Sequence, residues 1–374
     1  MNENFMLNIV YIITRSDVLG GASVHLLDLA KGMINQGHQV HILVGGEGTF
    51  TEELKKNNIN FSSLKYLKRE IALTHDVLGF WEIKKHLKQL KPDIVHCHSS
   101  KAGLLGRLAA KSLNLPVVFT AHGWAFTEGI SPTKQKIYAK IEKFLINFSD
   151  HIITVSEFDR IYGFNFGVGS PDKVTTVHNG IPIQDLQTKE TKVVGQPCKV
   201  IMVARFDDQK DQITLIQALG LLKDKNWVME FIGSGPTLER CKQEAKKLGL
   251  ENKIKFLGQQ RNVKDFLNNS DIFVLSTNYE GFPLTILEAM RAKLPVIATN
   301  VGGNNESIVG EKTGFLTKKN DAQDLSHALS TLIDDRNLAI EMGERGYERF
   351  ITEFTHDLML KKTLKIYTEV VTRK

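Results

Sequence analysis

Short apolar runs alternate with helical segments along the whole chain, and this alternation most constrains the fold. The first half contains the runs NIVYIIT, QVHILVG, DIVHCHS, PVVFTAHG and HIITVS, and the second half contains KVIMVAR, WVMEFIG, IKFLG, DIFVLS and PVIAT. Runs of this length suit strands that are buried on both faces of a sheet. Because helical segments separate several of them, the sequence predicts an α/β fold with doubly wound parallel sheets.

A polar stretch divides the two sets of runs. QTKETKVVGQP follows a His-Asn-Gly turn and Pro182, and its composition is typical of an interdomain linker. At 374 residues, of which 42% are apolar, the chain is long enough for two hydrophobic cores. We therefore expect two Rossmann-like domains, residues 1–190 and residues 191–355, followed by a helical segment, residues 356–374.

Composition excludes several classes of protein. The net charge of +6 is modest and spread along the chain, without the interleaved basic and aromatic residues of a nucleic-acid platform, so we expect no nucleic-acid partner. The three cysteines are isolated and lack metal-ligand spacing, which predicts buried thiols. No apolar run is long enough to cross a membrane, and the first residues lack the features of a secretory signal, so we expect a cytoplasmic protein.

Residues 271–306 carry the most informative pattern. A predicted strand is followed by the loop TNYEGF, a helical segment LTILEAMRAK, a second strand and the glycine loop VGGNNE. Gly281 allows a ligand to approach the backbone, and the amides of the following helix offer donors to an anion. Glu280 and Glu288 flank the helix start, although a single Glu there often only complements the helix dipole.

Three other loops follow predicted strands and are further candidates for a ligand site. Gly20 and Gly21 precede an amphipathic helix, but the loop is not G-x-G-x-x-G, and a tight turn explains it equally well. His122 lies directly after a strand and before a glycine, where a structural role is as good an interpretation as a functional one. Arg205 and Lys210 follow the strand KVIMVA and suit a diphosphate, although such loops often carry solvated charges.

Together these residues resemble a known family. The glutamate block is similar to the E-x7-E motif of retaining glycosyltransferases with the GT-B fold, often called family 4, and the resemblance covers nearly the whole chain. It implies two domains that face an interdomain cleft, with residues 356–374 packed back on the first domain. In that family the equivalent of Glu280 contacts the donor sugar and that of Glu288 holds the ribose hydroxyls.

The resemblance assigns roles to the other candidates as well. Arg205 and Lys210 match R-x4-K and would hold the donor phosphates, while Asp211 stands where the family usually has glycine. His122 would contact the hydroxyls of the sugar. The remaining residues that it implies are donor-binding positions Gly20, Gly21, Gly281, Phe282, Leu284 and Thr285, and acceptor-binding positions Ser99 and Lys101.

The activity implied is transfer of a hexosyl or N-acetylhexosaminyl group from a nucleotide sugar to a hydroxyl, with retained anomeric configuration. We expect a uridine donor, with guanosine left open, and a saccharide or lipid-linked saccharide acceptor in cell-surface polysaccharide or glycolipid assembly. No D-x-D sequence follows a predicted strand, so we expect neither a metal nor another cofactor. Two alternatives remain: a catalytically silent GT-B protein that binds sugars or regulates, and a nucleotide-sugar epimerase or hydrolase.

One predicted helix, SPTKQKIYAKIEKFLINF, carries an apolar face and a basic face. The basic face could rest on anionic headgroups and place the protein peripherally on the inner face of the cell membrane. A core-facing helix with a solvated lysine face is the interpretation that the sequence alone favours. The apolar residues are Ile137, Ile141, Phe144, Leu145 and Phe148, and the basic ones are Lys136, Lys140 and Lys143.

Overall fold

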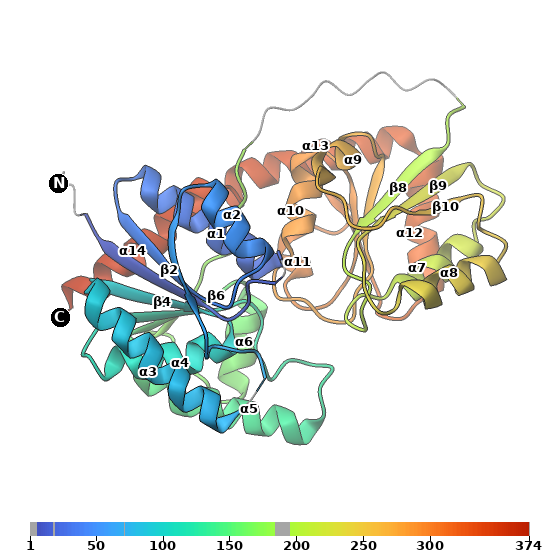
Figure 1. The fold of residues 1–374 in the computed structure, drawn as a ribbon. Helices are drawn as coiled ribbons and strands as arrows, with labels where there is room; N and C mark the ends of the chain where they lie inside the picture. The colour runs from blue at the N-terminus through green and yellow to red at the C-terminus, as the bar shows by residue number, and fades with distance from the viewer. Residues whose placement is uncertain (1–5, 18, 71, 184–194, 374) are drawn as a thin grey trace. The chain divides into compact units, whose positions relative to one another are not determined.

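A computed structural model describes residues 6–17, 19–70, 72–183 and 195–373 (Figure 1). The chain divides into two compact units, an N-terminal unit made of Met1–Pro182 with His356–Lys374, and a C-terminal unit, Ile183–Thr355. The expected boundary between residues 190 and 191 and most of the predicted linker lie outside the described residues.

The N-terminal unit is built on a parallel sheet. Within the described residues it has seven strands in the order β3-β2-β1-β4-β5-β6-β7. Every adjacent pair is parallel, as the alternation of strands and helices predicts. The strands are β1 (Asn8–Ile13), β2 (Gln39–Gly45), β3 (Asn60–Leu64), β4 (Ile94–His98), β5 (Val117–Ala121), β6 (His151–Thr154) and β7 (Val174–Thr176).

Helices cover both faces of this sheet (Figure 1). One hydrophobic core lies between the sheet and α1, α2 and α14, and a second lies between the sheet and α3, α4 and α5. The helices are α1 (Gly21–Asn35), α2 (Thr49–Lys56), α3 (Leu73–Leu90), α4 (Ser100–Lys111), α5 (Pro132–Leu145), the 3-10 turn η1 (Ile146–Phe148), α6 (Glu157–Asn165) and α14 (His356–Thr372).

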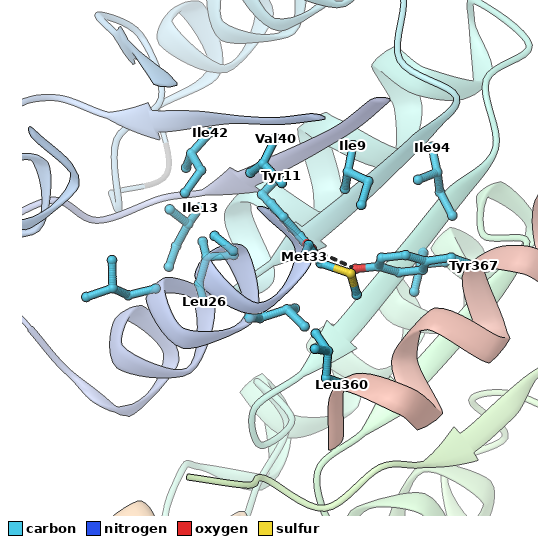
Figure 2. Close-up of a cluster of buried hydrophobic side chains, with 14 of the residues drawn as sticks. Ile9, Tyr11, Ile13, Leu26, Met33, Val40, Ile42, Ile94, Leu360 and Tyr367 are labelled. Atoms are coloured by element: carbon cyan, nitrogen blue, oxygen red, sulfur yellow. Dashed lines mark hydrogen bonds between the residues drawn. The ribbon is translucent and has the colours of Figure 1, made fainter. Parts of the chain in front are cut away.

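The last helix, α14, belongs to the N-terminal unit although it follows the C-terminal unit in sequence. It packs against α1, and Leu360 and Tyr367 are buried in the same core as Ile9 and Leu26 (Figure 2). The Tyr367 hydroxyl donates a hydrogen bond to the hydroxyl of Tyr11 at 3.3 Å. The N-terminal core is therefore completed by the end of the chain.

The C-terminal unit repeats the architecture. Its described sheet has six parallel strands in the order β10-β9-β8-β11-β12-β13. The strands are β8 (Cys198–Val203), β9 (Trp227–Ile232), β10 (Ile254–Phe256), β11 (Ile272–Leu275), β12 (Val296–Thr299) and β13 (Gly314–Thr317). The helices are α7 (Gln212–Gly220), α8 (Leu238–Lys247), α9 (Val263–Asn268), α10 (Leu284–Arg291), α11 (Asn304–Ser307), α12 (Ala322–Asp334) and α13 (Arg336–Glu353).

Both sheets confirm the predicted doubly wound fold, and both have a point at which the strand order reverses. In the N-terminal sheet it lies between β1 and β4, and in the C-terminal sheet between β8 and β11. Ligands of open parallel sheets bind outside the carboxyl ends of the strands at this reversal. The loops after these four strands are therefore where a site is expected in each unit.

Helix α5 differs from the interpretation that the sequence alone favoured. Its predicted apolar face is largely exposed, with Ile137 at 50% and Phe144 at 57% of their maximal accessible surface, whereas Leu145 is fully buried. The α-helix ends at Leu145 and a 3-10 turn follows, which changes the direction of the side chains after that residue. Most of the apolar face thus has no partner in the described part of the unit.

Candidate active site

The C-terminal unit brings together two of the predicted residues at the reversal of its strand order. Lys210 follows β8 and Glu280 follows β11, and their side chains form an ion pair. Only 13% of the Lys210 side chain and 7% of the Glu280 side chain are exposed. An ion pair that is this well buried needs further hydrogen bonds to offset the loss of hydration.

The Glu280 carboxylate has those further donors. The Thr277 hydroxyl donates to Oε1 at 2.9 Å, and the amide of Gln209 donates to Oε2 at 3.4 Å. The two loops are also joined through their backbones. The backbone amide of Asn278 donates to the backbone carbonyl of Gln209 at 2.8 Å. The carboxylate is held in one orientation by groups from both loops.

A glycine in the next loop supports the Glu280 backbone. Gly302 has a φ of +55°, and a Cβ atom there would lie 1.9 Å from the carbonyl oxygen of Glu280. The amide of Gly303 donates to the carbonyl of Gly281 at 2.9 Å. The VGGNNE loop therefore needs glycine at residue 302 both for its backbone conformation and for close packing.

Helix α10 begins beside Glu280. Pro283 is its N-cap residue rather than part of its first turn, and no side chain caps the helix. The amides of Leu284 and Thr285 belong to the first turn, where helical amides lack intrahelical partners and favour an anion. Phe282 is buried against Phe354, with ring centroids 5.3 Å apart, and fixes the start of the helix.

Glu288 lies one turn further along α10 than Leu284, so both residues share one face of the helix. Glu280, Gly281 and Glu288 are all partly accessible. The predicted donor-binding residues of this unit therefore gather around one helix start and the two loops after β8 and β11.

Arg205 is the more exposed of the two predicted cations. Its side chain is 58% exposed, and its guanidinium pairs with Asp207 at 2.9 Å. An exposed pair of this kind contributes roughly 0–1 kcal/mol to stability, so the guanidinium can exchange Asp207 for another anion. Asp211, which replaces the usual glycine, caps α7 by accepting from the amide of Thr214 at 3.1 Å, and its φ of −99° requires no glycine.

In the N-terminal unit His122 follows β5 and joins a group of histidines. Nε2 of His122 and Nδ1 of His98 share a hydrogen bond of 2.9 Å. His25, on α1, presents its ring edge-on to His122 with centroids 4.7 Å apart. His98 is fully buried at the end of β4, whereas His122 is half-buried.

Burial determines the charge of these histidines. It lowers the pKa of His25 to about 4, and it lowers the pKa values of His98 and His122 well below the usual value. Neighbouring imidazoles lower the pKa values of His98 and His122 further, because two positive rings would repel each other. All three rings are neutral at pH 7, and His122 can offer a hydrogen bond without a charge.

The glycines at the start of α1 have no packing reason to be glycine. A Cβ atom on Gly20 or Gly21 would meet nothing within 4 Å, and Gly20 has an ordinary φ of −102°. The helix has no side-chain cap. Gly20 is the N-cap residue, where glycine is common, so the helix start gives a reason for Gly20 but none for Gly21. Close approach of a ligand to the backbone would give a reason for both.

The two predicted acceptor residues hold the local structure. The hydroxyl of Ser99 bonds to the hydroxyl of Thr14 at 2.7 Å, and its backbone has φ 73° and ψ 151°, a region that residues other than glycine rarely occupy. Lys101 forms an ion pair with Asp76 and donates to the carbonyl of Glu70 at 3.0 Å. Lys101 would have to share its ammonium group to bind an acceptor.

Sequence reasoning did not select Thr277, Gln209, His98 or His25. The signal for His98 was its place at the end of a buried strand in the sequence HCH, where alternate residues share one face. Gln209 lies in the loop that contains Lys210 and gave no signal because its partner Glu280 is 71 residues away. Thr277 lies three residues before Glu280, and that spacing was the signal that could have found it.

Two family models match the chain. Glycosyltransferase Family 4 matches residues 19–185, and Glycosyl transferases group 1 matches residues 184–349. The chain is a GT-B glycosyltransferase of the family 4 type. Its two-unit architecture agrees with a glycosyltransferase from Rickettsia africae, with a TM-score of 0.82 and 24% identity over 99% of this chain and 100% of that one.

Similar curated proteins include bacterial glycosyltransferases. The chain is 28% identical, over 91% of each protein, to the Escherichia coli UDP-Gal:alpha-D-GlcNAc-diphosphoundecaprenol alpha-1,3-galactosyltransferase. It is 26% identical to the Staphylococcus aureus capsular polysaccharide biosynthesis glycosyltransferase CapM over 91% of this chain and 93% of CapM. Anabaena HepE, solved in complex with UDP and glucose, superposes with a TM-score of 0.83 at 20% identity over 97% of this chain and 99% of that one.

Among the described residues, no helix is both long and apolar enough to cross a membrane.

Proposed function

We propose that this glycosyltransferase moves a hexosyl or N-acetylhexosaminyl group from a UDP-sugar to a hydroxyl, with retention of the anomeric configuration. The observation that carries the proposal is the Lys210–Glu280 pair at the strand reversal of the C-terminal sheet, beside the uncapped start of α10. A UDP donor is supported by the name of the Escherichia coli relative and by the UDP complex of HepE.

Positive charge and helix amides account for the departure of the nucleotide. Arg205, Lys210 and the amides of Leu284 and Thr285 take up charge that develops on the diphosphate, while Pro283 has no N–H to offer. The leaving phosphate accepts the proton of the acceptor hydroxyl, and attack occurs from the same face of the sugar. These groups need no metal and no other cofactor, and we propose that the whole reaction proceeds without either.

The surroundings of Glu280 favour sugar binding over nucleophilic attack. Its Oε1 accepts from Lys210 and Thr277 and its Oε2 accepts from Gln209, so about one of its roughly four acceptor positions is left for a sugar hydroxyl, and the bound donors weaken it as a nucleophile. A retaining hydrolase would need a nucleophilic carboxylate and a second carboxyl group about 5 Å away on either side of the bond. We assign Glu280 to a sugar hydroxyl, Glu288 to the ribose, and neither to a covalent intermediate.

In the N-terminal unit we assign His122 to a hydroxyl of the sugar, and Gly20 and Gly21 to the diphosphate side of the donor. Neutral His122 suits a hydroxyl, which both donates and accepts hydrogen bonds. We propose a saccharide or lipid-linked saccharide acceptor in cell-surface polysaccharide assembly, near Ser99 and Lys101. The names of the Escherichia coli and Staphylococcus aureus relatives support this acceptor class.

To reach a lipid-linked acceptor, the protein must contact a membrane surface. The exposed face of α5 is suited to that contact. Ile137, Ile141 and Phe144 are exposed beside the exposed residues Lys136, Lys140 and Lys143. Helix α3, which lies on the same face of the sheet, also exposes Leu73 at 81% and Trp81 at 59%. Apolar side chains flanked by lysines suit the interface of an anionic membrane, and we propose that this surface binds it.

Sedimentation with vesicles tests the membrane proposal. We expect the protein to bind vesicles that contain anionic lipid, and to lose this binding when Lys136, Lys140 and Lys143 are changed to Ser, because each basic residue adds about 1 kcal/mol near the surface. The matched control changes three lysines of helix α8, in the C-terminal unit, to Ser: Lys242, Lys246 and Lys247. Failure of the unmutated protein to bind such vesicles would end the proposal.

Product analysis separates the proposed activity from its two alternatives. We expect purified protein with a panel of nucleotide sugars to form a glycosylated acceptor and free UDP. Release of free sugar and nucleotide without a glycosylated acceptor would favour a hydrolase, and conversion of the nucleotide sugar itself would favour an epimerase. Binding without turnover of any donor would favour a silent protein.

A further inference from the structure

The histidines beside the proposed sugar position form a compact group. His25, His98 and His122 come from α1, the end of β4 and the residue after β5. One ring nitrogen from each lies within 4.8 Å of the others, and Nδ1 of His98 lies 2.9 Å from Nε2 of His122. Within the described part of the chain, these are the three side chains whose spacing suits a shared metal ion.

The hydrogen bond between His98 and His122 does not use all the polar atoms of the group. Nδ1 of His25 and Nε2 of His98 are buried without a hydrogen-bond partner among the described residues. Only 6% of His25 and none of His98 are accessible to solvent. Buried imidazole nitrogens normally have a partner, so an ion bound at Nδ1 of His25 would supply the one that this ring lacks. Nε2 of His98 points away from Nδ1 of the same ring and is not counted as a ligand.

The chemistry of the rings favours a transition ion. Imidazole nitrogens from three different elements lie within 4.8 Å of one another and can offer their lone pairs to one ion. Neutral imidazole is a ligand of first-row transition ions, whereas Mg²⁺ and Ca²⁺ prefer oxygen ligands.

The geometry requires two adjustments, one within the His98–His122 pair and one at His25. Zinc binds imidazole nitrogen at about 2.0–2.1 Å, which places two ligands of a tetrahedral ion roughly 3.3 Å apart. The 2.9 Å pair of His98 and His122 must therefore open by a few tenths of an ångström, and His25 must approach by turning its ring. Because His122 is half-buried, it provides the side from which an ion can enter.

We propose that His25, His98 and His122 bind a transition ion of the Zn²⁺ type. The ion occupies the ring of His122 and thereby competes with the sugar, so it inhibits transfer rather than assists it. The competition rests on the proposed function, whereas the site itself does not.

Cobalt titration tests the site independently of activity. Tag-free protein is treated with a chelator, desalted and titrated with Co²⁺, whose visible absorption reports coordination by ring nitrogens. We expect a band that saturates at one ion per chain and is displaced by Zn²⁺. We expect His98→Gln and His25→Gln to weaken the binding at least ten-fold, about the loss typical of an altered metal site.

The control is His41→Gln, which changes a half-buried histidine of β2 that bonds to Ser62 and lies outside the group. Circular dichroism checks that each variant is folded. If His25→Gln or His98→Gln is not folded, His25→Asn is titrated in its place. Absence of a saturable band in the unmutated protein, or an unchanged band in folded variants of both His25 and His98, would overturn the site.

Sugar transfer measured with increasing Zn²⁺ tests the competition. We expect Zn²⁺ to raise the KM for the donor in the unmutated protein, and His25→Gln to need at least ten-fold more Zn²⁺ for the same effect. Saturation of the cobalt band without any change in transfer would contradict the competition and leave the site standing. If no donor is turned over, the proposed function fails while the cobalt titration still decides the site.

Discussion

At the scale of residues, the central feature is a carboxylate whose position depends on its neighbours. Glu280 accepts hydrogen bonds from Lys210 and Thr277, which come from different loops. A carboxylate held in this way can discriminate between the hydroxyl groups of a sugar. A displacement of about 1 Å in such a group can lower the rate by two orders of magnitude.

Thr277→Val tests this dependence. The change keeps the shape of the side chain but removes the hydroxyl that donates to Glu280 at 2.9 Å. We expect kcat to fall about 10-fold while the change costs only about 1–3 kcal/mol of stability. Steady-state rates and thermal melting measure the two effects, with Thr277→Ser as the control that retains the hydroxyl. Equal rates for the Val and Ser variants would contradict the role given to Thr277.

Gly302→Ala tests the support that the VGGNNE loop gives to Glu280. The added Cβ would lie 1.9 Å from the Glu280 carbonyl, and the residue would keep a positive φ. We expect a loss of stability of at least about 1 kcal/mol together with reduced transfer, because the Glu280 backbone must move. Gly310→Ala is the control, since a Cβ there meets nothing within 4 Å. Similar melting temperatures for the two variants would be the contrary result.

The sequence predicted where these residues lie but not which of them meet. Arg205, Lys210 and Glu280 could each be placed after a strand because apolar runs end just before them. The pairing of Lys210 with Glu280 spans 70 residues and depends on β8 and β11 being neighbours although β9 and β10 lie between them in sequence. Hydrophobic periodicity contains no information about that order of strands.

At the scale of elements, strands were predicted better than the partners of helices. A buried strand in a parallel sheet is recognisable because it is apolar on both faces. A helix with one apolar face must bury that face against something, but the sequence does not say what. The exposed face of α5 shows the difference, since its stripe resembles that of a core helix while Ile137 and Phe144 are exposed.

Helix α1 offers a test that separates a structural role from a ligand role. Because a Cβ on Gly21 meets nothing within 4 Å, we expect alanine there to leave stability unchanged or to raise it by up to about 1 kcal/mol. Alanine at Gly20, the N-cap residue, should cost no more than about 1 kcal/mol. If a phosphate approaches the backbone there, the same changes will raise the KM for the donor several-fold. Thermal melting and donor titration distinguish the two. Unaltered kinetics in both variants would leave the pair without a ligand role.

At the scale of the whole molecule, each unit has its own sheet, but the N-terminal unit depends on the end of the chain. Leu360 and Tyr367 of α14 are buried with strands β1 and β2, and Tyr367 also bonds to Nδ1 of His96 at 2.5 Å. This dependence was implied by the family resemblance and not by the local sequence, because residues 356–374 are an ordinary amphipathic helix.

Leu360→Ala tests the contribution of α14. Leu360 is 3% exposed, so its truncation leaves a cavity, and we expect a cost of about 2–5 kcal/mol. Hydrogen exchange followed by mass spectrometry should show faster exchange in the described residues of 6–182, with little change in 195–355. Lys362→Ala on the exposed side of the same helix is the control. Equal acceleration in both units would contradict the division of the chain.

Sugar transfer by matched variants of Glu280 tests the central claim most directly. Purified protein is supplied with the UDP-sugar that it turns over and a lipid-linked saccharide acceptor, and the rate and anomeric configuration of the product are measured. We predict retained configuration in the product and a rate more than 10-fold lower in Glu280→Ala, with Glu288→Ala weakening donor binding, as expected for ligands of the sugar and ribose. Rates like those of the unmutated protein in both variants, or an inverted product, would contradict the account.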